Sequence, residues 1–174
     1  AISLISGFDI GNFRNLQKVN KIAIEERSLP SDADLLTRLR ERLAADGYDV
    51  EAEPFGREPN RRNLLVEATG TERPDEILEL GAHYDTVPGS PGADDNATAV
   101  AGVLEVARVL STASLERTLV LACWDEEETG LVGSGAWATE QAEAGRDIIA
   151  SLVFEMIGYT CDEPGCQSMP LGFE

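Results

Sequence analysis

An almost unbroken apolar run, Thr118 to Trp124 (TLVLACW), constrains the fold more than any other part of this sequence. Such a run is typical of a strand that is buried on both faces of a parallel sheet. Ile148 to Phe154 is a second run of this kind, and Ser134 to Ala144 between them has the pattern of a helix that Gly145 closes. A strand, a helix and a further strand in this order predict a parallel sheet with helices packed on its faces.

The chain before Thr118 adds a helix and three more strands. Asn96 to Leu110 is apolar nearly all round, so we expect this helix to pack deep against the sheet. Ile77 to Ala82 predicts a strand, and Tyr48 to Ala52 and Asn63 to Ala68 predict two neighbouring antiparallel strands. The predicted fold class is therefore α/β, a three-layer α/β/α sandwich with a mixed, mostly parallel central sheet.

An amphipathic helix precedes these strands. Ser31 and Asp34 can cap and charge its start, Gly47 follows as its stop, and its apolar stripe consists of Leu35, Leu36, Leu39 and Leu43. Residues 1 to 25 have no clear period and remain an unassigned N-terminal segment. We assign residues 26 to 174 to one domain, because a chain of 174 residues is long enough for a single core and too short for two.

The charge of the chain argues against several kinds of partner. A formal net charge of -18 and a pI near 4.3 would repel a phosphate backbone, so we expect neither nucleic acid nor an anionic membrane surface as partner. No apolar stretch approaches the ~18 residues of a membrane helix, and the opening residues lack the basic leader of a signal peptide. We expect a soluble protein, while the compartment and the oligomeric state stay open.

Short acidic patches occur where predicted strands end or a helix begins. His83 and Asp85 follow one strand, Asp125 to Glu128 (DEEE) follow the next, and Glu155 follows the last. A fourth patch, Ala93 to Asn96 (ADDN), opens the apolar helix. In open α/β sheets the carboxyl ends of the strands border the ligand site, so we expect these side chains to meet at one rim.

So many acidic groups at one rim would repel one another without a cation. Carboxylates together with an imidazole suit Zn²⁺, Mn²⁺ or Co²⁺. Asp85, two residues after His83, can accept the second imidazole N–H and fix the tautomer that binds metal. The cysteines supply no CxxC pairs, and Cys161 and Cys166 near the C-terminus are as compatible with free thiols as with a disulfide.

Each patch taken singly has an ordinary explanation. DEEE has the composition of a solvated loop, and ADDN that of a helix cap. Glu155 is the exception, because a carboxylate at the end of the apolar run VFEMIG is costly to bury unless it binds something. The order and the strand-end placement of all four patches together favour a metal site.

Four motifs in succession resemble a known family. They are GAHYDT (81–86), PGADDNATA (91–99), EETGLVGS (127–134) and FEMIGY (154–159), and they resemble the signatures of the di-zinc aminopeptidases of the leucyl aminopeptidase and aminopeptidase Y type. The resemblance extends from about residue 35 to residue 158. It implies a zinc-exopeptidase-like fold and two Zn²⁺ ions in the complete family site.

The resemblance also implies roles for single residues. His83 is similar to the imidazole ligand of one zinc, with Asp85 behind it, and Asp95 to the carboxylate that bridges both metals, whose bond to the following asparagine the family often holds cis. Glu127 is similar to the general base and Glu128 to the ligand of the other zinc. Glu155 is placed as the remaining metal ligand.

Two departures from the family pattern affect the expected function. Glu155 stands where these aminopeptidases usually carry Asp, and Glu is more typical there of related carboxypeptidases and deacylases. The family's further histidine ligand is absent, since His83 is the one histidine of the chain. We expect a catalytic core that is incomplete at its C-terminal end, and the alternative is a natural domain that works with one metal or none.

The expected function is that of a zinc metallopeptidase that removes residues from the amino end of peptide substrates, with Glu127 as general base. Alternatives on the same scaffold are carboxypeptidase or deacylase action and glutaminyl cyclisation. A non-catalytic domain of the same fold is the alternative that the missing histidine favours.

Overall fold

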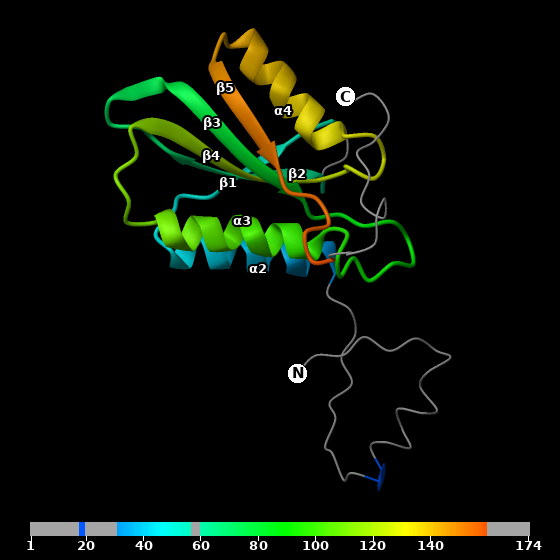
Figure 1. Ribbon diagram of the computed structural model, residues 1–174. Coiled ribbons are helices and arrows are strands. Elements are labelled where there is room, and N and C mark those ends of the chain that lie inside the picture. Colours follow the sequence, from blue (N-terminus) through cyan, green and yellow to red (C-terminus); the bar gives the residue numbers. More distant parts are fainter. Residues whose placement is uncertain (1–17, 20–30, 57–59, 160–174) are drawn as a thin grey trace, which may run out of the picture. The chain divides into compact units, whose positions relative to one another are not determined.

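The computed structural model describes residues 18–19, 31–56 and 60–159 (Figure 1). The chain divides into two compact units, residues 1–35 and 36–174. Of the first unit, the structure describes Lys18, Val19 and the residues that begin helix α2 (Asp32–Ala45). The cysteines at 161 and 166 lie outside the described residues. None of the described helices is long and apolar enough to cross a membrane.

A single five-stranded sheet forms the centre of the second unit, with the strand order β1-β2-β4-β3-β5. The strands are β1 (Glu51–Pro54), β2 (Arg62–Ala68), β3 (Arg73–His83), β4 (Arg117–Trp124) and β5 (Asp147–Val153). β2 pairs antiparallel with β1 and with β4, whereas β3 pairs parallel with β4 and β5. All strands except β2 therefore point the same way, which agrees with the predicted mixed, mostly parallel sheet.

Helices cover both faces of this sheet, as predicted for a three-layer sandwich. Figure 1 shows α2 and α3 (Ala97–Leu110) on one side and α4 (Val132–Glu143) on the other. The larger core cluster lies under α2 and α3 and includes Leu43, Val103 and Leu121. The smaller cluster lies under α4 and contains Trp137 and Trp124, whose ring centroids are 5.3 Å apart.

Local sequence signals explain the limits of the helices. At the start of α2, the Asp34 N–H donates to Ser31 Oγ and the Ser31 N–H donates to Asp34 Oδ2, a reciprocal pair that satisfies two otherwise unpaired amides. Gly47, with φ 92°, and Gly145, with φ 68°, follow α2 and α4 in the left-handed conformation that ends helices. The predicted cap and both predicted stops are confirmed.

The predicted burial of the last strand is wrong. β5 forms as expected, but the exposed fractions of Ile149, Leu152 and Val153 are 43%, 52% and 62%. The physical reason is its position: β5 is the edge strand of the sheet, and within the described part of the chain its outer edge has no neighbour. The apolar pattern identified the strand, yet it could not show whether other elements cover it.

Two glycines provide a test of packing in this fold. A Cβ at Gly70 would lie 2.5 Å from the carbonyl carbon of Arg117 and 2.6 Å from the backbone oxygen of Glu116, so Gly70→Ala must displace backbone. We expect it to lower the free energy of unfolding by about 1 to 3 kcal/mol. Gly135→Ala is the control, because a Cβ in this part of α4 meets nothing within 4 Å. It should raise stability by up to about 1 kcal/mol.

Urea denaturation of both variants measures the difference. Equal effects of the two substitutions on stability would contradict the close packing of Gly70 against the backbone of Glu116 and Arg117.

Candidate metal centre

The candidate site lies at the carboxyl end of the parallel strands. His83 is the last residue of β3, the loop that carries Glu127 and Glu128 follows β4, and Glu155 comes shortly after β5. Asp95 lies in the turn before α3. Because β3, β4 and β5 are parallel, their carboxyl ends lie at the same end of the sheet. The residues that follow these strands therefore come close together, as the sequence predicted.

His83 is the centre of the site. Its side chain is 2% exposed, and Nδ1 lies 3.1 Å from the backbone oxygen of Asp85 and 3.4 Å from its Oδ1. This contact favours the tautomer with the proton on Nδ1, which leaves the lone pair of Nε2 free toward the other carboxylates. Asp85 thus lies where the sequence predicted it, with its backbone oxygen nearer to the ring than its carboxylate.

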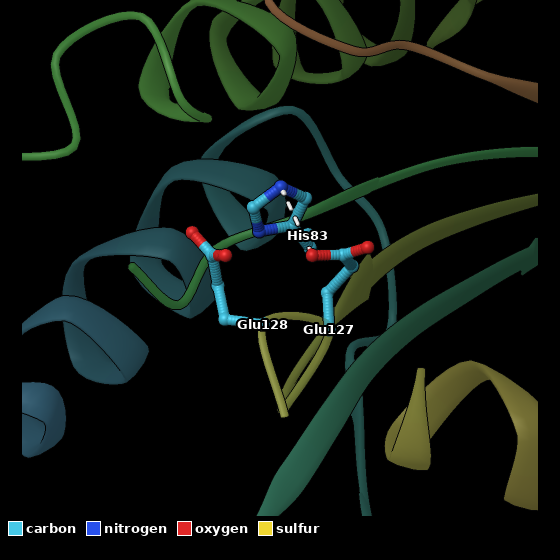
Figure 2. Close-up of side chains that lie close together, drawn as sticks. All are labelled: His83, Glu127 and Glu128. Atoms are coloured by element: carbon cyan, nitrogen blue, oxygen red, sulfur yellow. Dashed lines mark ion pairs between the residues drawn. The ribbon is translucent and has the colours of Figure 1, made fainter. Parts of the chain in front are cut away.

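Carboxylate oxygens surround Nε2 of His83. The distances are 3.1 Å to Asp95 Oδ1, 3.4 Å to Glu155 Oε2 and 3.8 Å to Glu127 Oε2. Among the described residues, potential ligand atoms within 4.8 Å of one another form two groups: His83 with Asp95 and Glu155, and His83 with Glu127 and Glu128. Figure 2 shows the second group, in which both glutamates extend toward the imidazole.

Asp85 connects His83 to the loop that carries the glutamates. Its Oδ1 accepts the Glu127 N–H and its Oδ2 accepts the Glu128 N–H, each at 3.1 Å. Burial acts to raise the pKa of Asp85, but the hydrogen bonds from His83 and from both amides outweigh it and lower the pKa. Asp85 is therefore an anion that orients the imidazole and the loop at once.

Asn96 fixes the position of Glu155. The Asp95–Asn96 peptide bond is cis, in agreement with the sequence expectation. The buried amide of Asn96 donates to Glu155 Oε2 at 3.0 Å and to the Phe154 oxygen at 3.2 Å, and its Oδ1 accepts the Met156 N–H at 3.0 Å. Glu155 is thus held next to Asp95 by Asn96, the residue that directly precedes α3.

The electrostatics of the site reflect crowded anions around one imidazole. Burial would lower the pKa of His83, but the hydrogen bond to Asp85 and the charges of Glu155 and Glu127 outweigh it and raise the pKa to about 9. Burial raises the pKa of Glu127, against the opposing charge of His83. The pKa of Glu155 is raised for the same reason. The proton that this raised pKa retains on the imidazole partly compensates the anions.

A divalent cation fits these residues. Glu128 Oε1 is buried and has no hydrogen-bond partner among the described residues, and buried Asp95 Oδ1 has none there apart from its ion pair with His83 Nε2. Buried carboxylate oxygens without a donor are costly, and a metal ion beside them would remove that cost. One imidazole with several carboxylates is a donor set suited to zinc, and the described Cys123 is buried in β4 as a free thiol.

Sequence reasoning missed the residues that support the loop after β4. Asn63 is fully buried and contacts this loop, and Arg61 forms an ion pair of 2.9 Å with Glu126. Asn63 had a detectable signal, because a polar residue at the start of the apolar strand NLLV is costly to bury unless it is paired. No comparable sequence signal marks Arg61, because a charged residue in a polar turn is ordinary.

Comparison with known proteins agrees with this geometry. A model described as Peptidase family M28 matches residues 63–172. Leucine aminopeptidase 1 of Sclerotinia sclerotiorum is 31% identical over 129 residues, which cover 67% of this chain and 33% of that protein. Aminopeptidase YwaD of Bacillus subtilis is 27% identical over 125 residues, 71% of this chain and 26% of that protein. The matched part of the chain spans about a quarter to a third of the length of these relatives.

Solved structures of aminopeptidases are also similar to this chain. A zinc aminopeptidase from Bacillus subtilis, BSAP, superposes with a TM-score of 0.50 at 29% identity over 56% of this chain and 24% of that protein. LapB from Legionella pneumophila has a TM-score of 0.63 at 23% identity over 84% of this chain and 43% of that protein, which shows a common fold. The match over residues 63–172, on a sheet that brings the motif residues to one edge, identifies the chain as a member of peptidase family M28.

Proposed function

We propose that this chain carries the metal-binding core of a zinc-dependent aminopeptidase. His83, Asp95, Glu128 and Glu155 are the proposed ligands, Glu127 is the general base and Asp85 orients His83 and the loop. The observation that carries this proposal is the cluster of carboxylates around His83, in which buried oxygens of Asp95 and Glu128 have no hydrogen-bond partner other than His83 among the described residues. Membership of family M28 and the similarity to aminopeptidases support it.

The reaction would be hydrolysis of the amino-terminal peptide bond. Bound zinc acidifies water and polarises a peptide carbonyl. Glu127 accepts the proton of the water as its oxygen attacks the carbonyl carbon, and it delivers that proton to the leaving nitrogen as the C–N bond breaks. A raised pKa suits Glu127 for both transfers, because an efficient general base has a pKa nearer to the working pH than an exposed glutamate has.

We expect one tightly bound zinc ion per chain. Both ligand groups include His83, but Nδ1 faces Asp85 and only Nε2 can bind a metal. A second ion would therefore have carboxylates alone. Elemental analysis after dialysis should give a ratio near one, and His83→Gln should weaken zinc binding by at least about 100-fold. Retention of zinc by His83→Gln would contradict the proposed site.

The role of Glu127 can be separated from ligation by comparing two neighbours. Glu127→Gln should leave zinc affinity nearly unchanged and lower the turnover of an aminoacyl anilide by about 10² to 10⁴. Glu128→Gln should lose zinc affinity as well as turnover. Glu143→Gln, on the exposed end of α4, is the control and should change neither. Full turnover by Glu127→Gln would exclude it as the base.

Substrate class is tested by a small panel. The aminopeptidase proposal predicts hydrolysis of aminoacyl anilides over N-acyl amino acids and over peptides with N-terminal glutamine. Preference for N-acyl amino acids would favour a deacylase or carboxypeptidase, and ring closure of N-terminal glutamine would favour a cyclase.

The raised pKa of His83 predicts a pH dependence of stability. Since its pKa is about 9 in the folded protein and 6.5 unfolded, its contribution is fully present below pH 6.5 and is lost as the pH rises to about 9. Chelated protein should lose up to about 3 kcal/mol of unfolding free energy over this interval. Saturating zinc should reverse the trend, because the metal competes with the proton on His83.

Urea titrations at several pH values, with and without chelator, provide the measurement. His83→Asn should flatten the profile of the chelated protein, and an unchanged slope in that variant would assign the effect to other groups.

A further inference from the structure

We propose that Asn63 is a positioning residue for residues 125–133, which run from the end of β4 into the first turn of α4 and are named here the glutamate loop because they include Glu127 and Glu128. Asn63 lies on β2, outside the motifs that resemble the peptidase family. Its effect on metal binding rests on the function proposed above, whereas its effect on the geometry of the glutamate loop does not. The inference adds a residue that acts through the loop without touching a metal or substrate.

The side chain of Asn63 joins both ends of the glutamate loop. Its Oδ1 accepts the Asp125 N–H at 3.3 Å, and its Nδ2 donates to the Gly133 oxygen at 2.9 Å. Nδ2 also donates to Glu53 Oε2 at 3.1 Å, which connects the amide to β1. A direct bond of 3.1 Å from the Gly133 N–H to the Asp125 oxygen closes the loop beside this amide.

The side-chain amide of Asn63 bonds to both ends of the glutamate loop because it is at once a donor and an acceptor. The Asp125 end needs an acceptor and the Gly133 end needs a donor, and asparagine supplies both from one planar group. Asn63 is fully buried, so no solvent replaces these bonds if they are lost. The space is closely packed, since a Cβ at Gly133 would collide with Asn63 Oδ1 and with the Asp125 backbone oxygen.

The glutamate loop needs such support because of its backbone. Glu126 and Leu131 have φ values of 55° and 60°, a region that side-chain-bearing residues adopt at a cost. Conformations of this kind persist where the surrounding structure holds them. Asp85 holds the middle of the loop through the amides of Glu127 and Glu128, and Asn63 holds its two ends.

A purely structural role for Asn63 predicts something different. Loss of any buried, fully paired polar side chain lowers global stability. Thr118 is such a side chain at the other end of β4: it is fully buried, accepts the Gly70 N–H at 3.0 Å and donates to the Pro74 oxygen at 2.7 Å. Thr118→Val therefore matches the general cost of an Asn63 variant and leaves the glutamate loop untouched.

The test compares Asn63→Leu with Thr118→Val in the chelated full chain. Amide hydrogen exchange is measured residue by residue, and global stability by urea denaturation. Asn63→Leu should speed exchange at the Glu127 and Glu128 amides by about 10- to 100-fold beyond what its global destabilisation explains. Thr118→Val should show no such excess. Equal protection of these two amides in both variants, after correction for stability, overturns the proposal.

Zinc binding by chelator competition is the second readout. Asn63→Leu should raise the zinc dissociation constant by about 10- to 100-fold, as is typical for residues that orient metal ligands, and Thr118→Val should leave it unchanged. If the wild-type protein binds no zinc, the proposed function is contradicted. The hydrogen-exchange measurement still tests the role of Asn63 in that case. Tight zinc binding by wild type and by Asn63→Leu alike would overturn the positioning role.

Asn63→Asp keeps the experiment decisive if the leucine variant does not fold. The aspartate retains the acceptor for the Asp125 N–H but, when ionised, cannot donate to the Gly133 oxygen. It should therefore open the Gly133 end of the loop and speed exchange at Glu127 and Glu128 in the same direction. Unchanged exchange at these amides in Asn63→Asp contradicts the proposal.

Discussion

The crowding of carboxylates around the buried imidazole of His83 is the constraint on which the rest of the site depends. Asp95, Glu127 and Glu155 approach Nε2 closely, and buried oxygens of Asp95 and Glu128 have no hydrogen-bond partner other than His83 among the described residues. The raised pKa of His83 retains a proton on the imidazole, which partly relieves the repulsion. A divalent cation would relieve it more fully, because it can interact with several carboxylates at once.

The scaffold holds these anions in place through neutral amides and one ionised carboxylate. Asp85 accepts the amides of Glu127 and Glu128, and Asn96 donates to Glu155. Asp85 follows β3 by two residues and Asn96 directly precedes α3, so both supports lie next to the ends of regular elements. Ligands in loops need rigid support to keep the geometry that metal binding requires.

Sequence reasoning predicted the layers, the strand-end location of the site and the proximity of His83, Asp95 and Glu155. Those features follow from hydrophobic patterns and from a topological rule for parallel sheets. The exposure of β5 could not be predicted, because apolarity reports a tendency to be buried and not the presence of a covering element. The contacts of Asn63 could not be predicted either, because Asp125 and Gly133 lie 62 and 70 positions away along the chain.

X-ray absorption at the zinc edge reports the atoms that surround the ion in the zinc-loaded protein, and it therefore tests whether His83 binds zinc. A zinc site centred on His83 should show one imidazole nitrogen and carboxylate oxygens at about 2.0 to 2.2 Å, with no sulfur. A sulfur shell at about 2.3 Å, or a spectrum without imidazole scattering, would contradict a zinc site centred on His83.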